Sequence, residues 1–378
     1  MKILILREDW QASLACIQSF GRRGHQVYAL RHGARSDHAR SDYLSGLLPA
    51  LPERPVEARA QALCDLVAAR GFDLVVPISD ADAGTVALAA ALRPDCRAFV
   101  SPSPAAVEVA RDRNRTAALC EALGLHMPAS RRVTRDSLPE AAAELGFPCF
   151  LKLSHSAASG GVFELASSAD LARAGAGLGA GVAAQLQRKV EGDFLGITGF
   201  CLQGRLLESA GFRAPYEDVR HGTPPYAWVE DSPQMVDILS RIAGHLNWTG
   251  GIDLDFIEEG DDRLALLEIN PRLSGTVNIA LALGRDLPAH YLAAIGAPPR
   301  PAPIAARRFD VFVSLAEEAR ARKRPGGVQA TRRIGRLRLA DNGYRDDRGY
   351  ARALFLRRCG LRCEEWGMRL LRRLRLRA

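Results

Sequence analysis

The hexapeptide LEINPR at residues 267–272 ends an apolar run and is the stretch that decides the fold. A second apolar run, GGIDLDFI at residues 250–257, precedes it. The acidic, glycine-containing sequence EEGDDR at residues 258–263 separates the two runs. Two apolar runs around a turn of this kind predict a β-hairpin.

Four polar side chains are expected on one face of this hairpin. Side chains alternate along a strand, so Asp253 and Asp255 share a face, and Glu268 and Asn270 share a face. With the turn centred at Gly260, Asp253 lies opposite Glu268, and Asp255 is its diagonal neighbour.

A cation would explain carboxylates on an otherwise apolar hairpin, because burying them unpaired is costly. Mg²⁺ suits such oxygen ligands and usually takes one or two carboxylates together with substrate phosphates. A solvated face of alternating acids would explain the same residues. The sequence Asn270-Pro271-Arg272 favours the metal site, because it places a guanidinium beside the acids, as phosphoryl transfer requires.

The pattern of residues 1–103 predicts a small doubly wound α/β domain. The sequence KILIL at residues 2–6 predicts a buried parallel strand, which a helix over about 10–23 and a strand over 26–30 follow. The alternation continues with a helix at about 56–70, an apolar segment at 73–78, a helix at about 82–92 and an apolar segment at 98–100. Arg7, Glu8 and Asp9 follow the first strand in place of glycines, so a G-x-G-x-x-G dinucleotide site is not expected.

The second unit contains a loop suited to phosphate binding. Helices are predicted over 104–123 and 137–145, and strands over 149–153 and 162–165. The small-residue loop at residues 154–161 joins the two strands, an order that excludes a P-loop. Such a loop can still fold over phosphates through its backbone N–H groups.

The net charge of +8 over 378 residues is divided unevenly. Residues 301–378 hold 21 Lys and Arg against 8 Asp and Glu, whereas residues 1–300 hold 30 against 35. Residues 351–378 place apolar side chains at helical spacing between arginines. This pattern predicts either contact with a membrane surface or an acidic partner, or a terminal helix packed on the body. Nucleic acid is not an expected partner, because no nucleic-acid-binding module is recognisable.

The remaining composition is that of an ordinary globular protein, with 47% hydrophobic and 25% charged residues. The eight cysteines are scattered, which predicts free thiols. No apolar stretch is long enough to span a bilayer, and the first residues lack a signal-peptide core, so a cytoplasmic protein is expected.

Four segments, in this order, resemble those of the ATP-grasp superfamily, and most closely the ATP-binding half of the carbamoyl-phosphate synthetase large chain. They are RDRNRT at 111–116 with LGL at 123–125, GFPCFLK at 146–152, QRKVEG at 187–192, and LEINPR at 267–272. The resemblance implies an α/β chain in three parts. These are a doubly wound pre-ATP-grasp domain (1–103), a two-lobed α+β ATP-grasp domain (104–300) with its lid lobe at about 130–190, and a basic helical C-terminal region (301–378).

The resemblance also implies roles for single residues. Arg272 and Lys152 are the implied catalytic residues. The implied ATP contacts are Arg113, Lys152, Ser154, Ser159, Gly160, Gly161, Gln187, Lys189, Val190 and Asp193. The implied metal ligands are Asp255, Glu268 and Asn270, for Mg²⁺ or alternatively Mn²⁺. Arg188 departs from the family pattern, which usually has Glu there, and Asp193 is only the nearest acid to the usual ribose-binding position.

The activity implied is that of a Mg²⁺-dependent ligase that joins a small-molecule carboxylate to an amine through an acylphosphate, releasing ADP and phosphate. The candidate substrate contacts are Arg213, His221, Ser274 and Asn278. An alternative is an ATP-grasp enzyme whose macromolecular or membrane-associated anionic substrate is recruited by residues 351–378. A non-catalytic nucleotide-binding regulator is the third hypothesis, and a homodimer is left open.

Overall fold

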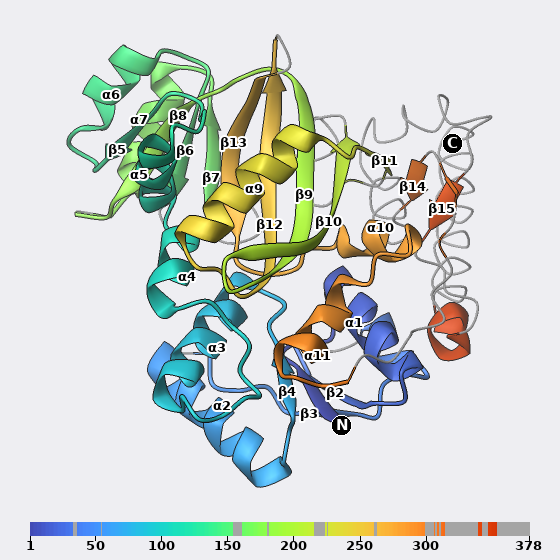
Figure 1. Ribbon diagram of the computed structural model, residues 1–378. Coiled ribbons are helices and arrows are strands. Elements are labelled where there is room, and N and C mark those ends of the chain that lie inside the picture. Colours follow the sequence, from blue (N-terminus) through green and yellow to red (C-terminus); the bar gives the residue numbers. More distant parts are fainter. Residues whose placement is uncertain are drawn as a thin grey trace, which may run out of the picture.

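The computed structural model describes the greater part of the chain. The described residues are 1–32, 36–53, 55–153, 161–179, 181–214, 224, 226–260, 263–298, 306, 308–309, 311–313, 339–341 and 347–353. Within them, the strands form three sheets (Figure 1).

The first sheet is parallel and lies at the bottom of Figure 1. Its strands run in the order β3 (Gly46–Leu48), β2 (Gln26–Leu30), β1 (Lys2–Ile5) and β4 (Leu74–Val76). Its helices are α1 (Gln11–Arg22), the 3-10 helix η1 (Asp37–Arg40), α2 (Val56–Arg70) and α3 (Asp80–Leu92). Ile3 packs with α1, whereas Leu4 packs with α2 and α3. Both faces of β1 are therefore buried, which is why its sequence is continuously apolar and confirms the doubly wound prediction.

The second sheet, at the upper left of Figure 1, is small and antiparallel. Its order is β5 (Ser130–Val133), β8 (Ala184–Arg188), β6 (Cys149–Leu153) and β7 (Val162–Leu165), with α6 (Leu138–Leu145) and α7 (Ser168–Gly177) packed on it. We call it the lid sheet. β6 and β7 have the predicted bounds. The N–H of Leu153 donates to the carbonyl of Gly161 at 2.8 Å, which closes the loop between the two strands.

The third sheet is the largest, and we call it the central sheet. Its order is β13 (Arg263–Asn270), β12 (Gly250–Glu259), β9 (Asp193–Leu202), β10 (Arg205–Ala214), β11 (Tyr226–Val229), β14 (Val311–Val313) and β15 (Leu339–Asp341). All neighbours are antiparallel except β14 and β15. One face packs on α4 (Pro104–Arg111), α5 (Arg113–Leu123) and α9 (Pro233–His245).

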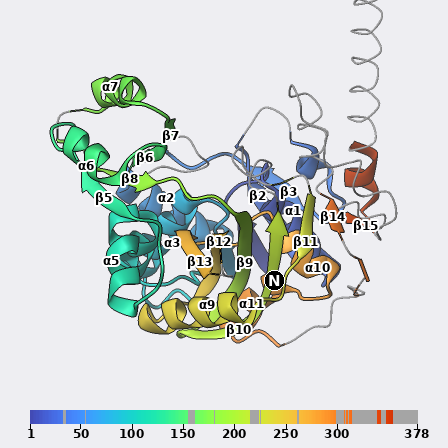
Figure 2. The same cartoon turned by 90° about the horizontal axis from the view of Figure 1, so that it is seen from above.

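The central sheet and the parallel sheet share an apolar core. This core joins Phe200 of β9 to α1, α10 (Val277–Ala282), η2 (Leu287–Ala289) and α11 (His290–Ala294). Figure 2, seen from above, shows α10 and α11 beside α1. The two parts are therefore packed as one body.

Two predicted elements differ from the observed ones. The helix predicted over 104–123 is divided, because Asp112 has an extended backbone (φ −97°, ψ 111°) and its carboxylate accepts the N–H of Asn114 at 2.8 Å. Asp112 is thus the N-cap of a second helix. The apolar residues 98–100 form no strand, and Phe99 makes only an isolated bridge with Val75.

The hairpin forms as predicted, but its register is shifted. Asp253 pairs with Asn270 and Asp255 with Glu268, whereas the sequence predicted Asp253 opposite Glu268. An irregularity after Asp255 leaves Leu267 as an extra residue on β13. A bulge of this kind adds one residue to one strand, which pattern counting does not anticipate.

Part of the C-terminal region is built into the body. The carboxylate of Asp347, fully buried, accepts from Gln18 Nε2 (2.8 Å), Ser41 Oγ (2.5 Å) and the N–H groups of Asp42 (2.9 Å) and Tyr350 (3.2 Å). Residues 347–353 are therefore fixed against α1 and η1. The basic segment 354–378 lies outside the described residues. Among the helices that are described, none is both long and apolar enough to cross a membrane.

Candidate functional site

The acids of the hairpin lie on one face, as predicted. Asn270 Nδ2 donates to Asp255 Oδ2 at 3.1 Å and to Asp253 Oδ2 at 3.4 Å. Leu254 and Ile269 pack on the opposite face, in the core with α9. Because Leu267 is an extra residue on β13, Glu268 lies on the same face as Asp253 and Asp255. The polar set therefore stays together although the register is shifted.

Asp253 has a local structural task. Its side chain is buried and accepts from Ser274 Oγ at 2.7 Å and from Thr276 Oγ1 at 3.4 Å. Burial raises the pKa of Asp253 to about 6. These hydrogen bonds fix the chain just after Arg272.

Arg113 joins the lid sheet to the acids. As the first residue of α5 it donates from Nη1 to the carbonyl of Leu153 at 2.8 Å, and Nη2 lies 3.4 Å from Glu268 Oε2. Gln185 of β8 donates to the carbonyl of Arg113 at 3.0 Å. The guanidinium thus lies where β6 ends.

Lys152 is buried on β6 and faces the same acids. Its Nζ donates to Gln187 Oε1 at 2.7 Å. Burial, and next the nearby Arg113, lower the pKa of Lys152 to about 8, while Glu268 and Asp255 act against them. Gln187 of β8 therefore uses its side chain to hold the lysine.

The acids repel one another where they meet. Burial and the carboxylates of Asp253 and Glu268 hold the pKa of Asp255 well above its usual range. Burial also tends to raise the pKa of Glu268, but Arg113 and Lys152 outweigh it, and the pKa lies below its ordinary value. A bound cation would relieve this crowding of negative charge.

The donor set fits Mg²⁺. Asp255, Glu268 and Asn270 offer two carboxylates and one amide oxygen, and substrate phosphates usually supply the remaining ligands. In the described part of the chain, no group of three or more His, Cys, Asp and Glu side chains is arranged to hold a metal. Asn270 presents its nitrogen to the acids and its Oδ1 to Arg272, so ligation through Oδ1 requires the amide to turn.

Arg272 is buried between the acids and the N-terminal part of the chain. Its Nη2 donates to Asn270 Oδ1 at 3.0 Å, and its Nε lies 3.2 Å from Asp80 Oδ1. Its guanidinium also lies over the ring of Trp10, 5.6 Å from the centroid. Asp80 and Trp10 were not among the predicted residues, since nothing in their local sequence connects them with Arg272.

Arg213 and Asp193, predicted for substrate and ribose, lie together in a different ion-pair network. Arg213 contacts Glu258 twice, one contact being Nη2 to Oε1 at 3.0 Å, and Glu230 and Asp193 at 3.2 Å each. These acids raise the pKa of Arg213 above its ordinary value. A substrate carboxylate would have to compete with three protein carboxylates, and both roles stay predictions.

The other predicted residues are dispersed. Lys189 Nζ pairs with Glu164 Oε1 of the lid sheet at 2.6 Å, and Val190 packs beside the apolar cluster of Phe194 and Phe212. Asn278 donates to the carbonyls of Gly275 (2.9 Å) and Gln11 (3.3 Å). Ser154, Ser159, Gly160 and His221 lie outside the described residues.

The segment that carries the hairpin and Arg272 is similar to a known protein family. Residues 219–314, which include the hairpin and Arg272, match the family model described as "ATP-grasp in the biosynthetic pathway with Ter operon". The comparison with curated proteins gives no match. The specific relation to carbamoyl-phosphate synthetase stays a prediction.

Solved structures show the same fold. The chain is 18% identical to carboxyaminoimidazole ribonucleotide synthase from Aspergillus clavatus complexed with ATP, with 83% of this chain and 81% of that one covered and a TM-score of 0.64. The chain is 15% identical to the biotin carboxylase domain of Hydrogenobacter thermophilus 2-oxoglutarate carboxylase, which holds MgADP and bicarbonate. The comparison covers 80% of this chain and 71% of that one, with a TM-score of 0.62. It is 14% identical to L-amino acid ligase from Bacillus licheniformis, with 78% of this chain and 74% of that one covered and a TM-score of 0.61. At these identities the likeness shows the fold alone.

Lys152 gives a prediction about pH. With a pKa of about 8 it loses its proton as the pH rises through that value, so the attraction that we expect between Lys152 and bound phosphate should be lost there. The Kd for MgATP of the free protein should therefore rise by up to about 10-fold between pH 7 and pH 9, by proton linkage. Calorimetric titration across this range measures it.

The control is Lys152→Arg, which stays charged at these pH values. Its Kd should change much less over the same range. A wild-type Kd that is constant from pH 7 to pH 9 would separate Lys152 from the bound phosphates.

Glu268 gives a prediction about the metal. Glu268→Gln keeps the size of the side chain but removes the charge of an expected metal ligand, so Mg²⁺-dependent binding of ADP should weaken by about 10- to 100-fold. Calorimetry with ADP, with and without Mg²⁺, measures this directly. Glu144→Gln on the lid surface is the control, since Glu144 pairs only with Arg131 in the contacts described. Equal Mg²⁺ effects in the two variants would remove Glu268 from the metal site.

Proposed function

We propose that this protein is an ATP-dependent ligase that joins a carboxylate to an amine through an acylphosphate. The observation that carries the proposal is the meeting of Arg113 and Lys152, from the lid side, with Asp255 and Glu268 of the hairpin. Cations placed against a metal-binding set of acids suit the triphosphate end of a nucleotide.

In the first step, an oxygen of the substrate carboxylate attacks the γ-phosphorus, and the bond to the β,γ-bridging oxygen breaks, releasing ADP. Arg113 and Lys152 hold the phosphates in line. Arg272 stabilises the negative charge that builds on the transferring phosphoryl group. Mg²⁺, when bound by Asp255, Glu268 and Asn270, supplies further neutralisation of phosphate charge.

In the second step, the amine attacks the acyl carbon, phosphate leaves, and the nitrogen loses a proton. The acylphosphate must be kept from water between the steps. The lid sheet suits this task, because β6 and β7 carry the loop between them at the site of Arg113.

The test is a screen for ADP release over carboxylic acids crossed with amines, at fixed MgATP. We expect at least one pair to raise the rate of ADP formation about 10-fold or more over the background hydrolysis, as productive orientation of two substrates does. Arg272→Ala should lose that stimulation while still binding MgADP. A broad panel in which no pair exceeds background would contradict the small-molecule ligase.

A second candidate function is modification of an anionic, membrane-associated substrate recruited by the basic tail. Two observations favour it. Residues 354–378 contain eight Arg and two Glu, and the segment just before them is fastened to the body through Asp347. Charge of this kind next to a fixed attachment point suits an anionic membrane surface.

A chain that ends at Ala353 tests this candidate. It keeps the Asp347 contacts, so its thermal unfolding should match that of the full chain. Co-sedimentation with anionic vesicles at low salt should fall by more than about 10-fold, since each arginine near the surface contributes about 1 kcal/mol. Neutral vesicles are the control. Equal co-sedimentation of both chains would exclude the tail as a membrane-docking element.

A further inference from the structure

The side chain of Arg272 is held from two directions by different parts of the chain. On the hairpin side, Nη2 donates to Asn270 Oδ1 at 3.0 Å. On the other side, Nε lies 3.2 Å from Asp80 Oδ1, in a pair whose side chains are only 13% and 18% exposed. The second contact comes from the N-terminal α/β domain.

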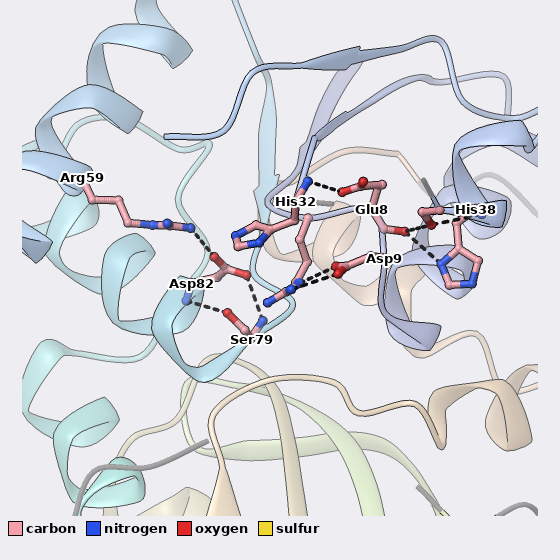
Figure 3. A network of polar contacts seen from close by, with 9 residues as sticks. Glu8, Asp9, His32, His38, Arg59, Ser79 and Asp82 are labelled. Atoms are coloured by element: carbon pink, nitrogen blue, oxygen red, sulfur yellow. Dashed lines mark hydrogen bonds and ion pairs between the residues drawn. The ribbon is translucent and has the colours of Figure 1, made fainter. Parts of the chain in front are cut away.

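Asp80 is not needed to cap its own helix. Ser79 Oγ accepts the N–H of Asp82, and Asp82 Oδ2 accepts the N–H of Ser79, which completes a capping box at the start of α3. Asp82 also receives Arg59 Nη2 at 2.6 Å in a buried ion pair (Figure 3). The turn that carries Asp80 is thus rigid, and its carboxylate is left to pair with Arg272.

Trp10 approaches the same guanidinium from α1. It precedes the first residue of that helix, and Arg7 and Arg272 both lie over its ring, at 4.5 Å and 5.6 Å from the centroid. Arg7 is itself held by Asp9, from Nε to Oδ1 at 2.7 Å. A guanidinium over an indole face within about 6 Å is an attractive arrangement.

Both contacts come from one edge of the parallel sheet. Trp10 follows β1 and Asp80 follows β4, and the strand order changes direction between these two neighbours. The carboxyl ends of strands at such a point are where open α/β sheets place functional groups. Here they face Arg272 of the hairpin.

We propose that Asp80 is a positioning residue for Arg272, with Trp10 supporting the guanidinium from its flat side, so that the N-terminal domain completes the phosphoryl-transfer site. This inference rests on the proposed function. A long arginine side chain acts well on a transferring phosphoryl group only if it is already oriented. The Asp80 carboxylate supplies that orientation without contacting substrate.

The test is the kinetics of Asp80→Asn in the stimulated ADP-release assay. Loss of the charge should lower kcat by roughly 10- to 100-fold, as small misplacements of a catalytic group do. The KM for ATP should stay within about 2-fold, because Arg113 and Lys152 are untouched. Asp80→Glu keeps the charge and should retain more of kcat than Asp80→Asn.

The matched control is Asp286→Asn. Asp286, the N-cap of η2, also forms a buried ion pair with the N-terminal domain, with Arg23 at 2.5 Å, and its described hydrogen bonds go to Ser19, Arg23 and Ala289. It reports what a weakened domain contact alone does. The proposal is overturned if Asp80→Asn lowers kcat no more than Asp286→Asn does.

A double-mutant cycle makes the assignment specific. If Asp80 acts through Arg272, the loss of kcat that Asp80→Asn causes should be much smaller in an Arg272→Lys background, which retains a positive charge and measurable turnover, than in the wild-type chain. Independent multiplication of the two effects would show that Asp80 acts elsewhere.

The same cycle separates this inference from the proposed function. If the wild-type chain forms no ADP with any substrate pair, the ligase proposal fails, and the cycle is measured instead by the shifts in thermal unfolding midpoint. A shift in the double variant that is smaller than the sum of the shifts in the two single variants would still support the Asp80–Arg272 pair. A shift equal to that sum would overturn it.

Discussion

Repulsion among three carboxylates is the constraint on which the rest of the site depends. Asp253, Asp255 and Glu268 are placed on one face by strand alternation together with the extra residue Leu267, and partial burial of that face makes their charges costly. The compensating cations, Arg113, Lys152 and Arg272, come from three separate elements. The set of charges is therefore complete only when the lid sheet, α5 and the hairpin of the central sheet are packed together.

The local part of this arrangement could be predicted from the sequence. Period-two alternation predicted the acids on one face, and the structure has them there because the extra residue Leu267 shifts β13 by one position and brings Glu268 to the face of Asp253 and Asp255. The exact pairing could not be predicted, since a bulge is decided by how two strands pack and not by the pattern of either one. The break at Asp112 was likewise missed, although Asp is a typical cap, because the apolar spacing continues past it.

Contacts between distant segments were beyond the sequence. Asp80 and Arg272 meet only because the edge of one sheet faces the end of a strand in another. Arg213 looked available for a substrate, yet three carboxylates surround it, from β9, from the end of β12 and from just beyond β11. Gln187 was implied only as an ATP contact, and the sequence did not indicate that its side chain accepts from Lys152. In each case the deciding partner is supplied by tertiary packing.

The buried carboxylate of Asp347 has a mechanical consequence. Tyr350, three residues after Asp347, packs with Leu14 of α1, Tyr226 of β11 and Val311 of β14. The segment therefore connects α1, which covers the parallel sheet, to two neighbouring strands of the central sheet. Through this contact the parallel sheet and the central sheet are held together as one rigid unit. We expect any opening and closing over a nucleotide to be confined to the lid sheet. The parallel sheet and the central sheet would stay fixed relative to each other, because residues 347–353 hold them together.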